Sequence, residues 1–146
     1  MASSEDWIPG YRIVAPRWSA NAFFGEGAAK SGGRWNSPGR RVIYLAGSRA
    51  LAALEMLVHL TSPGSRAKPY HMFEVLIPRD LIHDAPPGAD TAKIGDAWPA
   101  SGKSPALRVP SFLIPGEPNY LLDPAHPDMS RLRIGKPWEF HFDPRL

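Results

Sequence analysis

The chain of 146 residues contains no cysteine. Disulfides, thiolate nucleophiles and cysteine-ligated metals are therefore excluded, and nothing indicates an oxidising compartment. Long hydrophobic runs are also missing, since the longest apolar stretch, residues 51–60, is interrupted by Glu55 and His59 and is far too short to span a bilayer. The N-terminus carries acidic residues where a signal peptide has basic ones. We expect a cytosolic protein without a membrane segment.

Several motifs of nucleotide, metal and nucleophile sites are absent as well. No G-x-G-x-x-G stretch follows a strand and opens a helix, and no G-K-[ST] occurs, which argues against a Rossmann site or a P-loop. The five histidines are dispersed without H-x-x-x-H or H-E-x-x-H spacing, so we predict no metal. No serine lies in a G-x-S-x-G elbow.

The chain has little excess charge and no repeat. Its formal net charge is +3, from 17 Lys and Arg against 14 Asp and Glu that are mixed along the sequence. This balance suits a phosphate-bearing small molecule, an acidic partner or nucleic acid, and does not choose among them. With no linker and no low-complexity tract, we expect a single domain spanning residues 1–146.

What is present predicts an α+β fold. The 13 glycines and 17 prolines, which follow no period, indicate short elements joined by tight turns. One helix is expected over about residues 49–60, with Ser48 capping its first free amides. Strands are expected at residues 11–15, 41–46, 70–77, 107–114 (bent by Pro110), 119–122 and 137–142.

The predicted helix carries one carboxylate close to its apolar stripe. At 100° per residue, Leu51, Leu54, Leu57 and Val58 form the stripe, and Glu55 lies beside it. A carboxylate in that position must be hydrogen-bonded or face a cleft, because its burial without a partner is costly. The alternative is a boundary glutamate that reaches into water.

A glycine-rich segment, residues 32–39, predicts a tight loop that delivers Arg34 and Trp35. Tyr44 follows in a predicted strand, and Glu55 follows in the predicted helix. The pattern sets a cation, an aromatic ring and a carboxylate around one strand and one helix. Taken singly, Arg34 could form a surface ion pair and Tyr44 could be a core ring with a satisfied hydroxyl.

Blocks of sequence along nearly the whole chain resemble the RES domain, in that family's order and spacing. They are GRWNSPG at 33–39, VIYLA at 42–46, LEMLVHL at 54–60, RVPS at 108–111, NYLL at 119–122, PAHPD at 124–128 and FDPRL at 142–146. The resemblance implies an ADP-ribosyltransferase-like fold, in which two small β-sheets pack at an angle around an NAD cleft with few helices. It also implies a toxin that acts on NAD as its substrate.

The resemblance assigns roles to individual residues. Glu55 would stabilise the positive charge that develops on the ribose when the nicotinamide bond breaks. Arg34 and Arg12 would hold the NAD phosphates. Tyr44 would stack on nicotinamide or direct its hydroxyl at the ribose. The expected catalytic residues are thus Glu55, Arg34 and Tyr44.

Two further residues match family positions and complete the expected NAD-binding set. Ser111 would hydrogen-bond the ribose or nicotinamide, and it lacks the surroundings of a serine nucleophile. Asn119 would contribute as well, with a turn or capping role as its alternative. The chain departs from the family at Asp123, where asparagine is expected before Pro124. That difference puts the role of this loop in doubt.

The resemblance also implies partners and a location. The partner would be an antitoxin with an Xre-like helix-turn-helix domain, whose C-terminal segment blocks the NAD cleft in the bacterial cytoplasm, while this chain itself binds no DNA. ADP-ribose would pass to a protein side chain, or to water or phosphate, which would deplete NAD. Two alternatives stay open: a small basic ribonuclease that uses Arg34, Glu55 and a histidine, and a binding module without catalysis.

Overall fold

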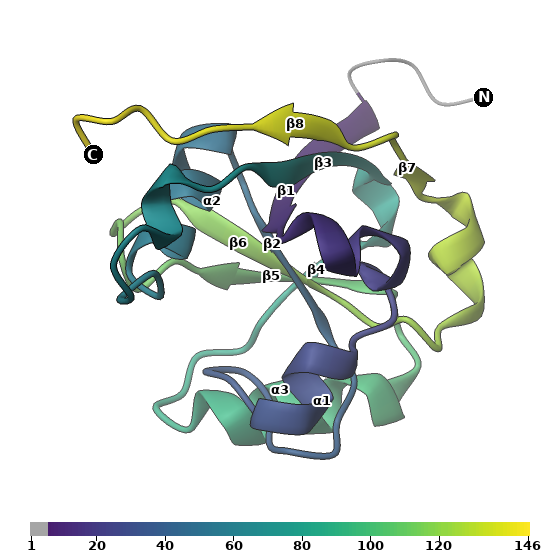
Figure 1. Ribbon diagram of the computed structural model, residues 1–146. Helices are drawn as coiled ribbons and strands as arrows, with labels where there is room; N and C mark the ends of the chain where they lie inside the picture. Colours follow the sequence, from purple (N-terminus) through teal and green to yellow (C-terminus); the bar gives the residue numbers. More distant parts are fainter. Residues whose placement is uncertain (1–5) are drawn as a thin grey trace.

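Strands dominate the computed structural model, which describes residues 6–146 (Figure 1). The first five residues belong to the predicted domain and to the segment that argues against a signal peptide, and they lie outside the described residues. The strands are β1 (Trp7–Val14), β2 (Ile43–Ala46), β3 (Tyr70–Pro78), β4 (Ile82–Asp84), β5 (Ala106–Pro110), β6 (Pro118–Leu122), β7 (Arg133–Ile134) and β8 (Trp138–Phe140). The α-helices are α1 (Glu26–Ser31), α2 (Arg49–Leu57) and α3 (Thr91–Ser101). Short 3-10 helices are η2 (Pro16–Asn21), η3 (Ser65–Ala67), η4 (Arg79–Leu81) and η5 (Pro127–Arg131).

The strands form one eight-stranded sheet in the order β4-β5-β6-β2-β1-β3-β7, with β8 also paired to β3. All pairs are antiparallel except β4 with β5. The two halves of the sheet meet where β1 pairs with β2, and there the register contains a single pair, Tyr11 with Ala46. The α+β prediction is confirmed. The two expected sheets are halves of one sheet, joined at this narrow seam.

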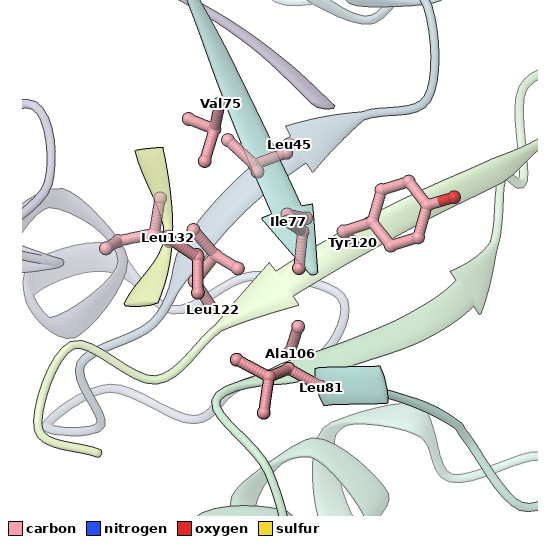
Figure 2. Packing of buried hydrophobic residues seen from close by; sticks show 9 residues of the cluster. Leu45, Val75, Ile77, Leu81, Ala106, Tyr120, Leu122 and Leu132 are labelled. Carbon is pink, nitrogen blue, oxygen red and sulfur yellow. The ribbon is translucent and has the colours of Figure 1, made fainter. Parts of the chain in front are cut away.

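Alternation along β2 sends its side chains to two different places. Ile43 and Leu45 point into the main core, where they pack with residues of β3, β5 and β6 (Figure 2). Tyr44, between them, packs on the other side with a second cluster that contains Trp35 and Trp98. The period of two therefore frees Tyr44 from the main core and turns it toward the segment that precedes β2.

Helix α2 begins as predicted, with the Ser48 hydroxyl accepting a hydrogen bond from the Leu51 amide at 3.0 Å. The predicted apolar stripe is wrong for Leu54 and Val58, which are 39% and 53% exposed. The helix packs on β1 and β2 through Leu51 and the small Ala52 instead, which are buried. Glu55 lies one turn after both residues, so this rotation carries it inward to a half-buried position.

The strand predicted over residues 107–114 is too long. β5 ends at Pro110, and the chain then turns, because proline cannot donate to the ladder and the Ser111 side chain binds the amides of Leu113 and Ile114. Within residues 6–146, no helix has the length and apolar character needed to cross a membrane.

Candidate active site

A cleft of about 950 Å³ is lined by β1, β2, α2, the glycine-rich loop and the turn after β5. This volume is near the upper end of the range for small-molecule sites, roughly 300–1,000 Å³. Five of the six residues predicted for the site line it: Arg12, Arg34, Tyr44, Glu55 and Asn119. Ser111 does not line the cleft and lies behind Glu55, to which it is hydrogen-bonded.

The Glu55 carboxylate is held by two side chains. The Ser111 hydroxyl donates to Oε1 at 3.0 Å, and the Asn119 amide Nδ2 donates to the same oxygen at 3.1 Å. Oε2 takes no part in either bond. Two donors on one oxygen fix the direction of the side chain, so the site holds an oriented carboxylate at the cleft wall.

Ser111 is a fixed donor because of the turn that follows it. Its oxygen accepts hydrogen bonds from the amides of Leu113 and Ile114, at 3.2 and 3.1 Å. Both lone pairs are thereby used, which leaves the hydroxyl proton for Glu55. The hydroxyl thus points to the carboxylate, whereas the family resemblance had suggested a direct contact with the ribose or nicotinamide.

Ser111→Ala should lower the free energy of unfolding by about 1–2 kcal/mol, because it removes three partly buried hydrogen bonds, to Glu55, Leu113 and Ile114. Urea denaturation measures this change, with Ser130→Ala as the control, since the Ser130 hydroxyl is exposed and bonds only the Pro127 carbonyl. Equal unfolding free energies for the two variants would contradict the role given to Ser111.

Arg12 on β1 brings a partly desolvated cation to the cleft. Its Nε donates to the Ala22 carbonyl at 2.9 Å, and Nη1 donates to the Tyr44 carbonyl at 3.2 Å. Burial lowers the pKa of this guanidinium from its ordinary value. No ion pair between side chains of residues 6–146 includes Arg12. Two of the five guanidinium N–H groups are used, so the rest are suited to an anion in the cleft.

Arg34 reaches the cleft from a tight turn in the glycine-rich loop. Gly33 and Asn36 form an antiparallel bridge, and a side chain on Gly33 would lie 2.7 Å from the Tyr44 hydroxyl. The guanidinium of Arg34 is exposed and lies 4.0 Å from the centre of the Phe112 ring. The loop therefore delivers Arg34 as the glycines predict, and Phe112 supports it by a cation–π contact.

Tyr44 anchors this loop through its hydroxyl. The hydroxyl donates to Asn36 Oδ1 at 2.6 Å and accepts from the Trp35 amide at 3.1 Å. Burial raises the pKa of Tyr44, the Trp35 N–H lowers it, and the charge of Asp96 raises it further, with a net rise. The ring is thereby left as part of the cleft wall while the hydroxyl holds the loop.

The raised pKa of Tyr44 predicts a pH dependence. The folded state holds this proton more tightly than the unfolded chain, so the free energy of unfolding should fall as the pH rises above 10.0, the ordinary tyrosine value. Tyr44→Phe removes the group, so the fall should be shallower in the variant. Urea unfolding at pH values below and above 10.0 measures how steeply the free energy of unfolding of each protein changes with pH. Equal slopes in the two proteins would contradict this prediction.

Asn119 and Asp123 have different structural roles: Asn119 binds Glu55, and Asp123 stabilises a turn. The Nδ2 of Asn119 serves Glu55, while its Oδ1 is buried and has no hydrogen-bond partner within the described chain. The Oδ1 of Asp123 accepts from the Ala125 amide at 3.0 Å in a turn. Aspartate and asparagine both make such turns, so the departure from the family pattern leaves the loop intact.

The fold and the cleft define a class of protein: a mixed α+β protein in which two arginines and a hydrogen-bonded glutamate line one cleft. The RES domain family model matches residues 9–143, and the chain belongs to that family. The resemblance seen in the sequence is thus confirmed. In residues 6–146 no group of three or more His, Cys, Asp or Glu could hold a metal ion.

Relatives of known name cover most of the chain. A protein of Yersinia enterocolitica named "Toxin Res" is 40% identical, over 93% of this chain and 97% of its own length. The "Prs ADP-ribosylating toxin" of a Sphingobium species is 35% identical, over 90% of this chain and 91% of its own. The crystal structure of the M. tuberculosis MbcT–MbcA toxin–antitoxin complex contains a similar fold, with a TM-score of 0.74 and 18% identity over 92% of this chain and 85% of that one.

Proposed function

We propose that this chain is the toxin of a type II toxin–antitoxin pair, and that it cleaves the nicotinamide–ribose bond of NAD and transfers ADP-ribose to an acceptor. Membership of the RES family and the names of the relatives support this function. The observation that carries it is the charge arrangement of one cleft. Arg12 lies there without a carboxylate partner in the described chain, and Glu55 lies there as an oriented anion.

The binding step follows from the cations. The pyrophosphate of NAD would lie between Arg12 and Arg34, whose planar forks suit phosphate oxygens. Arg12 gains most from this contact, because an anion would compensate for its desolvation. The aromatic wall at Tyr44 would take the nicotinamide ring by stacking.

The chemical step uses the carboxylate. As the bond from the ribose to nicotinamide breaks, its electron pair leaves with the nicotinamide nitrogen, and the ribose becomes an oxocarbenium-like cation. Glu55 stabilises that charge, and its fixed hydrogen bonds to Ser111 and Asn119 mean that little reorganisation is needed. An acceptor then attacks the ribose carbon and loses a proton.

The acceptor distinguishes two outcomes of the same chemistry. A protein side chain would make the chain a mono-ADP-ribosyltransferase, whereas water or phosphate would make it an NAD-depleting enzyme. The Sphingobium relative is named for ADP-ribosylating Prs, which supports transfer to another molecule over hydrolysis. We place this activity in the bacterial cytoplasm and in one domain of residues 1–146.

The regulatory partner would be an antitoxin with an Xre-like helix-turn-helix domain, and its C-terminal segment would block the cleft. The fold of a chain in a toxin–antitoxin complex supports a partner of this kind. Exposed apolar side chains along the cleft support such a partner too. Val58, Phe112 and Leu113 line the cleft and are 53%, 52% and 37% exposed. Operator recognition would come from the antitoxin, so this chain alone should bind no specific DNA.

The experiment incubates the purified protein with labelled NAD, with and without cell extract, and follows free nicotinamide and the label. Nicotinamide release, with label on a protein band, supports transfer. Release with all label remaining on small molecules supports depletion. No release from folded protein under any condition would overturn the proposal. Cleavage of RNA that weakens with salt would then favour the ribonuclease alternative.

A further inference from the structure

Helix α3, which no sequence pattern singled out, lies against the loop that carries Arg34. One face of this helix holds residues three, four and seven positions apart: Thr91, Ile94, Gly95 and Trp98. Trp98 is buried and packs, together with Ile94, in the same cluster as Trp35 of the loop. The helix is therefore attached to the loop along its inner face.

Two hydrogen bonds join α3 to the backbone of the loop. The Thr91 hydroxyl donates to the carbonyl oxygen of Arg34 at 2.5 Å. Three residues further along the loop, the Ser37 amide donates to Asp96 Oδ1 at 2.9 Å. Both contacts involve the backbone of the loop, so they constrain the chain that carries Arg34 and leave its guanidinium free.

Gly95 brings the two backbones together. A Cβ at this position would lie 1.7 Å from the Trp35 carbonyl oxygen and 2.8 Å from its carbon. A glycine inside a helix is unfavourable relative to alanine, and close approach of another backbone is a reason to retain it. Any side chain at position 95 would force the helix and the loop apart.

The loop has two other anchors, so the contribution of α3 can be separated from theirs. Tyr44 of β2 binds the loop through Trp35 and Asn36, and Asn36 Nδ2 donates to the Ala28 carbonyl of α1 at 2.8 Å. Arg34 lies between the glycines and these anchors, and Thr91 is the residue of α3 whose side chain binds the Arg34 carbonyl.

We propose that α3 is a positioning element for Arg34, with Thr91 and Asp96 as its positioning residues. This inference rests on the proposed function, in which Arg34 binds the pyrophosphate of NAD. Arg34 would hold the pyrophosphate equally in the ground state and the transition state, because the breaking bond is at the ribose. Loosening the loop should therefore raise KM and leave kcat unchanged.

The first test compares Thr91→Val, which keeps the shape and removes the donor, with Thr91→Ser, which keeps the hydroxyl. Thr91→Val should raise KM for NAD about fivefold, as expected for the loss of one hydrogen bond, with kcat within about twofold of the original. Thr91→Ser should have the same KM for NAD as the unaltered protein. Thr61→Val, at an exposed threonine that does not line the cleft, is the matched control.

A second variant excludes direct contact between Thr91 and NAD, since Thr91 also lines the cleft. Asp96→Ala removes the acceptor of the Ser37 amide, and Asp96 does not line the cleft, so its KM should rise as well. A KM unchanged in Asp96→Ala, or a fall in kcat in both variants, would overturn the positioning role. If the unaltered protein neither binds nor cleaves NAD, the proposed function fails first, and the variants are not needed to show it.

Discussion

Glu55→Gln should lower kcat for nicotinamide release by about 100- to 1,000-fold, the loss seen when one electrostatic group at a reacting centre is removed. Glutamine has the same shape, and its Oε1 can still accept from Ser111 and Asn119. The substitution therefore removes the negative charge that would stabilise the ribose cation and keeps the hydrogen-bond network. KM for NAD should change little, because the charge acts mainly in the transition state.

The matched control for this variant is Glu117→Gln, since Glu117 is exposed and does not line the cleft. Steady-state nicotinamide release, with far-UV circular dichroism to verify folding, measures both proteins. If Glu55→Gln retained the kcat of the control, the carboxylate could not be the group that stabilises the ribose.

Arg12→Met should weaken the binding of NAD by about 10- to 100-fold, because a hydrogen bond to a charged group contributes about 1.5–3 kcal/mol. Methionine fills a similar volume without charge, so the anion loses its partner. Binding of ADP-ribose, measured by calorimetry, reports this loss without depending on catalysis. The affinity of Arg12→Lys for ADP-ribose should lie between those of the unaltered protein and Arg12→Met, since lysine keeps the charge and loses the planar fork.

The control here is Arg17→Met, at an exposed arginine whose guanidinium lies over Trp18 and does not line the cleft. Arg12→Met also leaves the Ala22 and Tyr44 carbonyls without their donor. Thermal unfolding of the free protein must therefore accompany the binding data. ADP-ribose affinity equal in Arg12→Met and Arg17→Met would contradict a phosphate-binding role for Arg12.

The sequence predicted the parts of the site that depend on local chemistry. Glycines in the 32–39 segment require a tight turn, and alternation along β2 separates Tyr44 from Ile43 and Leu45. The Ser48 cap fixed the start of α2. These features follow from backbone conformation and side-chain period, which a single sequence contains.

The remaining features depend on tertiary contacts. The rotation of α2, which exposes Leu54 and Val58, depends on how closely Ala52 approaches the sheet. The donor role of Ser111 depends on the turn that supplies the Leu113 and Ile114 amides. Neither contact leaves a period or a motif in the sequence.

Helix α3 shows the same limit most clearly. It contains Gly95 and Pro99, both unfavourable inside a helix, and no helix was predicted in this segment. The Asp90 cap, which accepts from the Lys93 amide, was a readable signal for its start. Its contacts with the Arg34 loop, however, exist only after the chain has folded.

A crystal structure of Glu55→Gln soaked with NAD would test most directly whether this cleft binds and cleaves NAD. We expect pyrophosphate oxygens within hydrogen-bond distance of both Arg12 and Arg34, and the nicotinamide ribose against the amide at position 55. NAD bound in the opposite direction, with its adenosine at position 55, or bound outside this cleft, would contradict the roles proposed for Arg12, Arg34 and Glu55.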